Sequence, residues 1–86
     1  MNQAFEVRFT RQAAKDFDKL APKLRAKVKK LCHEILQNTP FEGKHLVGEL
    51  QGSYSLRLSY QDRLVYSVDL SNRVVYVERC RTHYGD

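Results

Sequence analysis

The first half of the chain contains one strand-like segment followed by two helix-like segments. Residues 5–9 (FEVRF) alternate apolar and polar side chains, which is typical of a half-buried strand. Apolar positions then recur every three or four residues from Thr10, a residue type that caps helices, to about Ala21. Pro22 suits the first turn of a second helix, which should end near Asn38 because a proline follows two residues later. The apolar stripe of this second helix consists of Leu24, Val28, Leu31 and Ile35.

The second half predicts three strands after a glycine-rich loop. Residues 40–52 (PFEGKHLVGELQG) contain three glycines and should form a loop or turn. Residues 53–58, 63–68 and 73–80 are predicted strands, separated by the turn sequences YQD and DLSN. The expected fold class is therefore α+β, in the order β-α-α-β-β-β. Its sheet should be antiparallel, with the two N-terminal helices packed on one face.

Positive charge is distributed unevenly along the chain. The 86 residues carry a net charge of +5, which favours an acidic partner, and their number predicts a single domain, 1–86. All seven lysines occur at or before Lys44. Every later basic residue is an arginine, the residue type that makes forked contacts to phosphate: Arg57, Arg63, Arg73, Arg79 and Arg81. A helical stripe of three lysines is either a solvated face or a contact for RNA phosphate: Lys23, Lys27 and Lys30.

Several classes of protein are disfavoured by the composition. No stretch approaches the ~18 apolar residues of a membrane span, and the N-terminus lacks the features of a secretory signal. Cys32 and Cys80 are too few for a disulfide framework, so a cytoplasmic protein with reduced thiols is expected. The cysteines and histidines lack the spacing of a zinc site, and neither a metal nor another cofactor is expected.

The sequence RCRTHYGD, residues 79–86, groups side chains that suit RNA cleavage. Arg79, Arg81 and His83 share one strand parity and would point to one side of the sheet, whereas Tyr84 would point to the other. Arginine can stabilise charge on a phosphate, and histidine can protonate a departing oxygen near neutral pH. Because the RNA 2′-hydroxyl is the nucleophile, the protein needs to supply none. Residue types alone make this a weak signal, since such a cluster is more often surface decoration.

Four segments of the chain carry a recognisable pattern: TPFEGK (39–44), LQGSYSLRL (50–58), DRLVYSV (62–68) and CRTHYGD (80–86). Together they resemble toxins of the RelE/YoeB superfamily, which are ribosome-associated mRNA interferases of toxin–antitoxin systems. The resemblance covers nearly the whole chain and is closest to the YoeB branch. It implies a microbial-RNase-like fold, with Arg63 on the scissile phosphate and His83 and Tyr84 completing the site. It also implies that Arg57 and Arg81 line the RNA groove.

This sequence differs from the YoeB pattern at the position of the proposed general base. YoeB-type enzymes have a glutamate in the loop before the second strand, and ungapped counting places Lys44 there. Glu49 lies in the same loop. Glu49 and Lys44 are therefore both expected to support catalysis, and the residue types leave the base unassigned.

The resemblance implies a translation-dependent, metal-free endoribonuclease that leaves a 2′,3′-cyclic phosphate and a 5′-hydroxyl. Its expected partners are the 70S ribosome with mRNA and a cognate acidic antitoxin, with operator DNA bound only through the antitoxin complex and no membrane. Two alternatives stay open. One is a ParE-like toxin that inhibits DNA gyrase, although such relatives generally lack the His-Tyr ending. The other is a non-catalytic RNA-binding or regulatory module.

Overall fold

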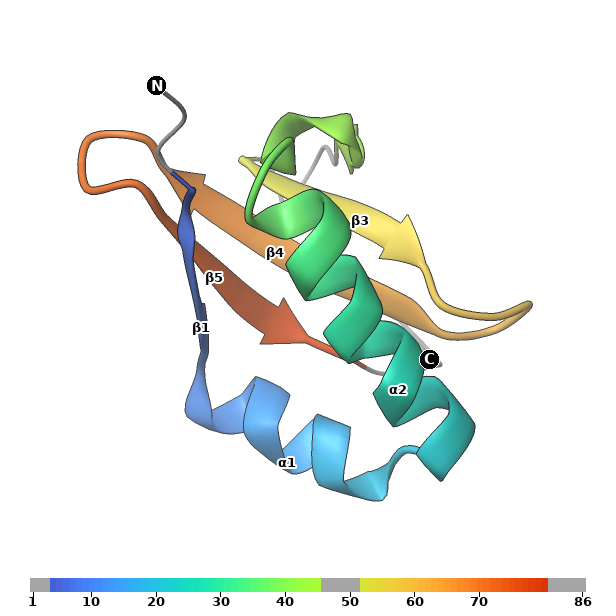
Figure 1. Ribbon diagram of the computed structural model, residues 1–86. Helices are drawn as coiled ribbons and strands as arrows, with labels where there is room; N and C mark the ends of the chain where they lie inside the picture. The colour runs from blue at the N-terminus through green and yellow to red at the C-terminus, as the bar shows by residue number, and fades with distance from the viewer. Residues whose placement is uncertain (1–3, 46–51, 81–86) are drawn as a thin grey trace.

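A computed structural model describes residues 4–45 and 52–80, which form a sheet with helices packed against it (Figure 1). Strand β1 (Glu6–Phe9) leads into helices α1 (Arg11–Lys19) and α2 (Pro22–Leu31). A π-helical segment (Cys32–Leu36) and a 3-10 turn (Pro40–Glu42) come next. The remaining strands are β2 (Lys44–His45), β3 (Ser53–Arg57), β4 (Arg63–Asp69) and β5 (Val74–Arg79). The predicted α+β fold is confirmed.

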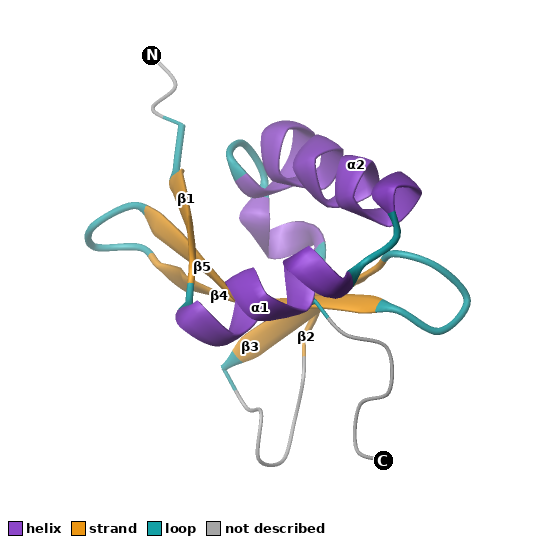
Figure 2. Ribbon diagram, turned by 90° about the horizontal axis from the view of Figure 1, so that it is seen from below, coloured by secondary structure: helices purple, strands orange, loops and turns teal. Residues whose placement is uncertain are grey.

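The sheet has the strand order β1-β5-β4-β3-β2 and is mixed rather than purely antiparallel. Strands β3, β4 and β5 form the predicted antiparallel meander, and β2 adds an antiparallel edge inside the segment predicted as loop. Strand β1 is the exception, because it pairs with β5 in parallel, from Glu6 beside Val74 to Phe9 beside Val77. The helices carry the chain across the sheet after β1, so β5 arrives last and fills the place beside β1. Both helices contribute to the core on one face of the sheet, α1 through Ala13 and α2 through Val28, and Figure 2 shows α2 on that side.

The helix boundaries follow from local chemistry. The Thr10 hydroxyl accepts a hydrogen bond from the Ala13 amide at 3.1 Å and caps α1 as predicted. Pro22 occupies the first turn of α2. The second predicted helix corresponds to two consecutive elements, because the π-helical segment Cys32–Leu36 continues directly from the end of α2. No helix within residues 4–45 and 52–80 is long and apolar enough to cross a membrane.

The core lies between the helices and the sheet, and Tyr66 ties its rim together. Val28 and Leu36 from the helices meet Leu64 and Val77 from the strands, and all four are fully buried. The buried Tyr66 hydroxyl donates to the Pro40 carbonyl at 2.6 Å and accepts from the Gly43 amide at 3.0 Å. A side chain at residue 43 would collide with this hydroxyl. The turn before β2 is thereby held against the sheet, which fixes where β2 begins.

Candidate functional site

Strands β3 and β4 present two arginines on the face of the sheet opposite the core. Leu58 and Leu64 are buried in the core, so the alternating residues Arg57 and Arg63 point the other way. These two arginines are direct partners in the antiparallel register. Like charges placed opposite each other destabilise a sheet. An arrangement that brings two guanidinium groups together is therefore suited to an anion that lies between them.

The turn between β3 and β4 sets this register. The Ser59 hydroxyl bonds the Asp62 carboxylate at 2.9 Å and accepts from the Asp62 amide at 3.0 Å. The Leu58 amide donates to the Asp62 carbonyl at 2.8 Å. Asp62 is buried, so these bonds are shielded from water. A four-residue turn with this chemistry places Arg57 and Arg63 side by side.

Lys44 reaches the same face from the edge of the sheet. Lys44 pairs with Ser55 of β3, which lies two residues before Arg57. Residues two apart on a strand share a face, so Lys44 and the arginine pair lie on the same side of the sheet. Ser55 is 3% exposed, and its hydroxyl has no hydrogen-bond partner among the described residues. A buried hydroxyl without a partner is costly, so it marks a place where an oxygen-rich ligand would be stabilised.

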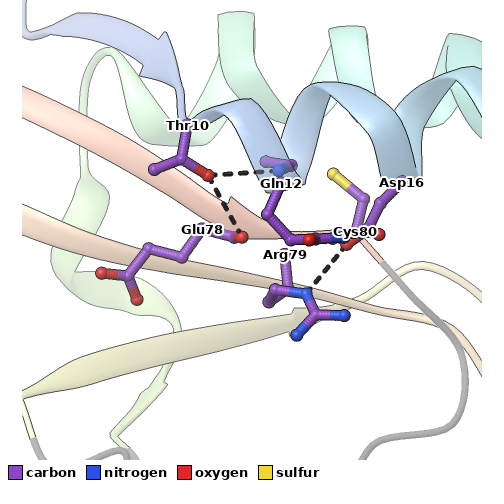
Figure 3. Close-up of polar contacts among 7 residues, drawn as sticks. Thr10, Gln12, Asp16, Glu78, Arg79 and Cys80 are labelled. Atoms are coloured by element: carbon purple, nitrogen blue, oxygen red, sulfur yellow. Dashed lines mark hydrogen bonds and ion pairs between the residues drawn. The ribbon is translucent and has the colours of Figure 1, made fainter.

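A β-bulge in β5 brings Arg79 to this face as well. Val65 is opposite Arg79 and Tyr66 is opposite Val77, so Glu78 is an extra residue on β5. In Figure 3 the side chain of Glu78 extends away from α1, whereas Arg79 contacts Asp16 of α1 through its Nε. We call this surface, formed by Lys44, Arg57, Arg63 and Arg79, the basic face.

The bulge interrupts the backbone hydrogen bonds between β4 and β5, and side chains of Thr10 and helix α1 bond the backbone there instead. The Thr10 hydroxyl donates to the Glu78 carbonyl at 3.3 Å (Figure 3). The Asp16 carboxylate accepts from the Cys80 amide at 3.1 Å and from Arg79 Nε at 3.0 Å. Its other oxygen accepts from Gln12 at 2.9 Å. The bulge is thus anchored from the helical layer, and Arg79 is held as part of an ion pair.

The same contacts set the charge state of Asp16. Its side chain is 8% exposed, and this burial acts to raise the pKa of the carboxyl. The hydrogen bonds from the Cys80 amide, Gln12 and Arg79, together with the Arg79 charge, act in the opposite direction and prevail. The pKa of Asp16 is therefore lowered, and the buried group stays ionised at neutral pH.

One carboxylate accompanies the basic residues. The Ser53 hydroxyl bonds Glu78 Oε1 at 2.9 Å, although Ser53 belongs to β3 and Glu78 to β5. This bond crosses β4 and shows that side chains of β3 and β5 meet on one face of the sheet. The basic face therefore has an acidic member held in a fixed place.

The family is decided by comparison with known proteins. The family model for the YoeB-like toxin of bacterial type II toxin–antitoxin systems matches residues 9–84. The chain belongs to this family. None of the curated proteins compared with the toxin matches it.

Solved structures of similar toxins agree with this assignment. The toxin–antitoxin complex RelBE2 from Mycobacterium tuberculosis includes a chain with 30% identity and a TM-score of 0.80, covering 96% of this toxin and 95% of that chain. The YoeB–YefM complex from Staphylococcus aureus gives 30% identity and a TM-score of 0.76, with 93% and 98% covered. The intact RelBE complex from Escherichia coli gives 28% identity and a TM-score of 0.79, with 94% and 99% covered.

The structure brings together four of the toxin's predicted site residues: Lys44, Arg57, Arg63 and Arg79. Four others lie outside the described residues: Glu49, Arg81, His83 and Tyr84. The predicted lysine stripe is on α2 and exposed, which places it in the helical layer on the opposite side of the sheet: Lys23, Lys27 and Lys30.

Two features of the toxin's site were missed in the sequence. Asp16 lies three residues after Ala13 and four before Leu20, so it shares their apolar helix face. A carboxylate on such a face was the sequence signal that could have indicated a buried ion pair. The Ser53–Glu78 bond had no such signal, because it depends on strand order and on the bulge in β5.

Proposed function

We propose that this toxin is a ribosome-dependent mRNA endonuclease. It would cut mRNA by attack of a 2′-hydroxyl on the adjacent phosphate, leaving a 2′,3′-cyclic phosphate and a 5′-hydroxyl. The observation that carries the proposal is the basic face, where Arg57 and Arg63 lie directly opposite each other beside Lys44. Membership of the YoeB-like family supports the same activity.

The chemistry assigns a role to each group. Arg63, with Arg57 beside it, would bind the scissile phosphate and stabilise the charge that develops in the transition state. His83 would protonate the departing 5′-oxygen, and Tyr84 would stack on a base or hydrogen-bond to the reacting groups. Lys44 and Glu49 would support the reaction from the loop before β3. Arg79 and Arg81 would contact neighbouring RNA phosphates, and no metal or cofactor is needed for this scheme.

We further propose a cognate acidic antitoxin as the regulatory partner. The similar toxins in the RelBE2, YoeB–YefM and RelBE structures are each bound to an antitoxin. A disordered acidic segment that folds on binding would be attracted to the basic face and would exclude RNA from it. The toxin–antitoxin pair, rather than the toxin alone, would bind operator DNA.

The test is to map the 5′ ends of cellular mRNA after the toxin is expressed without antitoxin in the bacterial cytoplasm. We expect growth arrest and new 5′ ends at ribosome-bound codons. Arg63→Ala and His83→Ala should each abolish these ends while the purified variants keep the melting temperature of the wild type.

Other outcomes would point elsewhere. Growth arrest with intact mRNA and inhibited DNA gyrase would replace the proposal with a ParE-like activity. Full cleavage by His83→Ala would remove the assigned acid. Binding to ribosomes without cleavage by the wild-type toxin would indicate a non-catalytic RNA-binding module.

A further inference from the structure

Glu78 occupies an unusual backbone position on β5. It is the extra residue of the bulge and has no direct partner on β4. Bulges re-aim side chains and are common beside active sites. Here the backbone on both sides of the bulge is held by Thr10 and Asp16 from α1. The direction of the Glu78 side chain is therefore fixed by contacts from another layer of the fold.

The Glu78 carboxylate is also held at its far end. The hydroxyl of Ser53, which is 7% exposed, bonds Oε1 at 2.9 Å from across β4. No other described residue bonds or pairs with this carboxylate. One oxygen is thus fixed while the other remains available to a ligand. Neither Arg57 nor Arg63 neutralises the carboxylate, although they lie on the same face.

Within residues 4–45 and 52–80, Glu78 is the one acidic side chain of this face that lies beside the basic residues without belonging to a turn. Asp69 shares the strand parity of Arg63 but lies at the far end of β4, where it bonds Asn72 in the turn. Asp62 is committed to the turn with Ser59. Lys44 is nearby, but an ammonium group has three donors and no acceptor, so it suits charge stabilisation better than proton removal.

We propose that Glu78 is the general base that removes the 2′-hydroxyl proton, and that Ser53 positions its carboxylate. This inference rests on the proposed RNA cleavage and deepens it by assigning the base. Ser53 and Arg57 are four residues apart on β3, or about 13 Å along the strand. The carboxylate bound to Ser53 and the arginine pair therefore flank a space with Lys44 and Ser55 at its middle.

The step balances with the groups on this face. Glu78 takes the proton of the 2′-hydroxyl, and the 2′-oxygen forms a new bond to the phosphorus. The bond from phosphorus to the 5′-oxygen breaks with its electron pair, and His83 protonates that oxygen. Arg57, Arg63 and Lys44 stabilise the negative charge on the non-bridging oxygens. A carboxylate at one end of a basic face suits this sequence, because the proton and the charge are handled at different places.

The test compares Glu78→Gln with the wild-type toxin on purified ribosomes that carry a short defined mRNA. Glutamine keeps the shape and can still accept from Ser53, but it cannot take up the proton. We expect kcat to fall by about 10²-fold or more, the range of general-base catalysis. The acid side of the pH–rate profile should flatten. Binding to ribosomes carrying mRNA with a 2′-O-methyl group at the cut site should stay unchanged.

Matched variants separate this role from others. Glu34→Gln removes the same charge from an exposed helical position and should cut at the wild-type rate. Glu78→Asp keeps a carboxylate and should retain the acid side of the profile at a reduced rate. Ser53→Ala should lower kcat about tenfold without weakening binding, because the base is still present but less well placed.

Three results would overturn the inference. These are cleavage by Glu78→Gln within about threefold of the wild type, a faster rate than the wild type, or a loss confined to binding. Arg63→Ala run in the same assay identifies which idea has failed. If Arg63→Ala is inactive while Glu78→Gln cuts normally, the proposed function stands and Glu78 is not the base. If the wild-type toxin does not cut at all, the proposed function itself fails.

Discussion

At the scale of single residues, Tyr66 connects the core to the basic face. Its ring belongs to the buried cluster, while its hydroxyl bonds the turn that precedes Lys44. Burial raises the pKa of Tyr66 to about 12. One hydroxyl thus serves both stability and the placement of Lys44, because its two hydrogen bonds hold the turn from Pro40 to Gly43 against the sheet.

We expect Tyr66→Phe to destabilise the toxin by about 1–3 kcal/mol, because the Pro40 carbonyl and the Gly43 amide lose their partner. Denaturant unfolding at neutral pH measures this loss. Tyr60→Phe is the control, since Tyr60 is 89% exposed and should unfold as the wild type does. Equal stability of Tyr66→Phe and wild type would show that the two bonds do not hold the turn.

The raised pKa also fixes the sign of the alkaline response. A tyrosine whose folded pKa exceeds its unfolded value stabilises the fold fully below the unfolded value, about 10. This contribution is lost as the pH rises from about 10 towards 12. Wild-type stability should therefore fall over this range, and Tyr66→Phe should lose less, because its side chain does not ionise.

At the scale of elements, α1 and β5 form one unit. Asp16 on α1 bonds Arg79 and the Cys80 amide at the end of β5, next to the segment that contains His83 (Figure 3). Thr10, at the start of α1, bonds the bulge itself. The helix therefore fixes both the direction of Glu78 and the point from which the chain continues beyond β5.

We expect Asp16→Asn to destabilise the toxin by about 2–3 kcal/mol at neutral pH, because charge-assisted bonds to Arg79 and Cys80 are lost from a buried place. Cleavage should fall as well, since the bulge that aims Glu78 is loosened. The carboxyl has a lowered folded pKa, so its stabilisation is complete above the unfolded value and declines as the pH falls below about 4.

Asp18→Asn is the matched control on the same helix, because Asp18 is exposed. Thermal unfolding between pH 2 and 7 separates the two variants. The wild type and Asp18→Asn should lose stability steeply on the acid side, and Asp16→Asn should lose less there. The same acid response in all three proteins would remove Asp16 from this role.

The elements that sequence could predict are those with a local signal. Alternation predicted β3 and β4, enrichment in valine and tyrosine predicted β5, and Thr10 and Pro22 marked the helix starts. The parallel pairing of β1 with β5 carries no local signal, because it depends on which strand arrives last at an edge. The direct pairing of Arg57 with Arg63 depends on the register between β3 and β4, which cannot be read from the sequence. Arg79 and Glu78 reach the basic face together only because of the bulge in β5, and the periodicity of apolar residues does not predict a bulge.

At the scale of the whole molecule, positive charge lies on two opposite surfaces. The basic face occupies one side of the sheet, and the stripe of exposed lysines on α2 lies in the helical layer on the other side. The proposed cleavage of RNA would use only the first surface. The second has no role in the proposed reaction, but phosphate contacts from a second surface would hold the toxin on a large RNA assembly.

We therefore expect the triple change of Lys23, Lys27 and Lys30 to glutamine to weaken ribosome binding and to reduce its dependence on salt. Each lysine that contacts a phosphate releases a counterion, so the slope of log affinity against log salt should become less steep by about two to three. The rate of cleavage in saturated toxin–ribosome complexes should not change, because the basic face is intact. A control triple change of Arg11, Lys15 and Lys19 to glutamine removes the same charge from exposed positions on α1. If both triple variants flatten the slope equally, the effect is one of net charge, and the stripe on α2 is only a solvated surface.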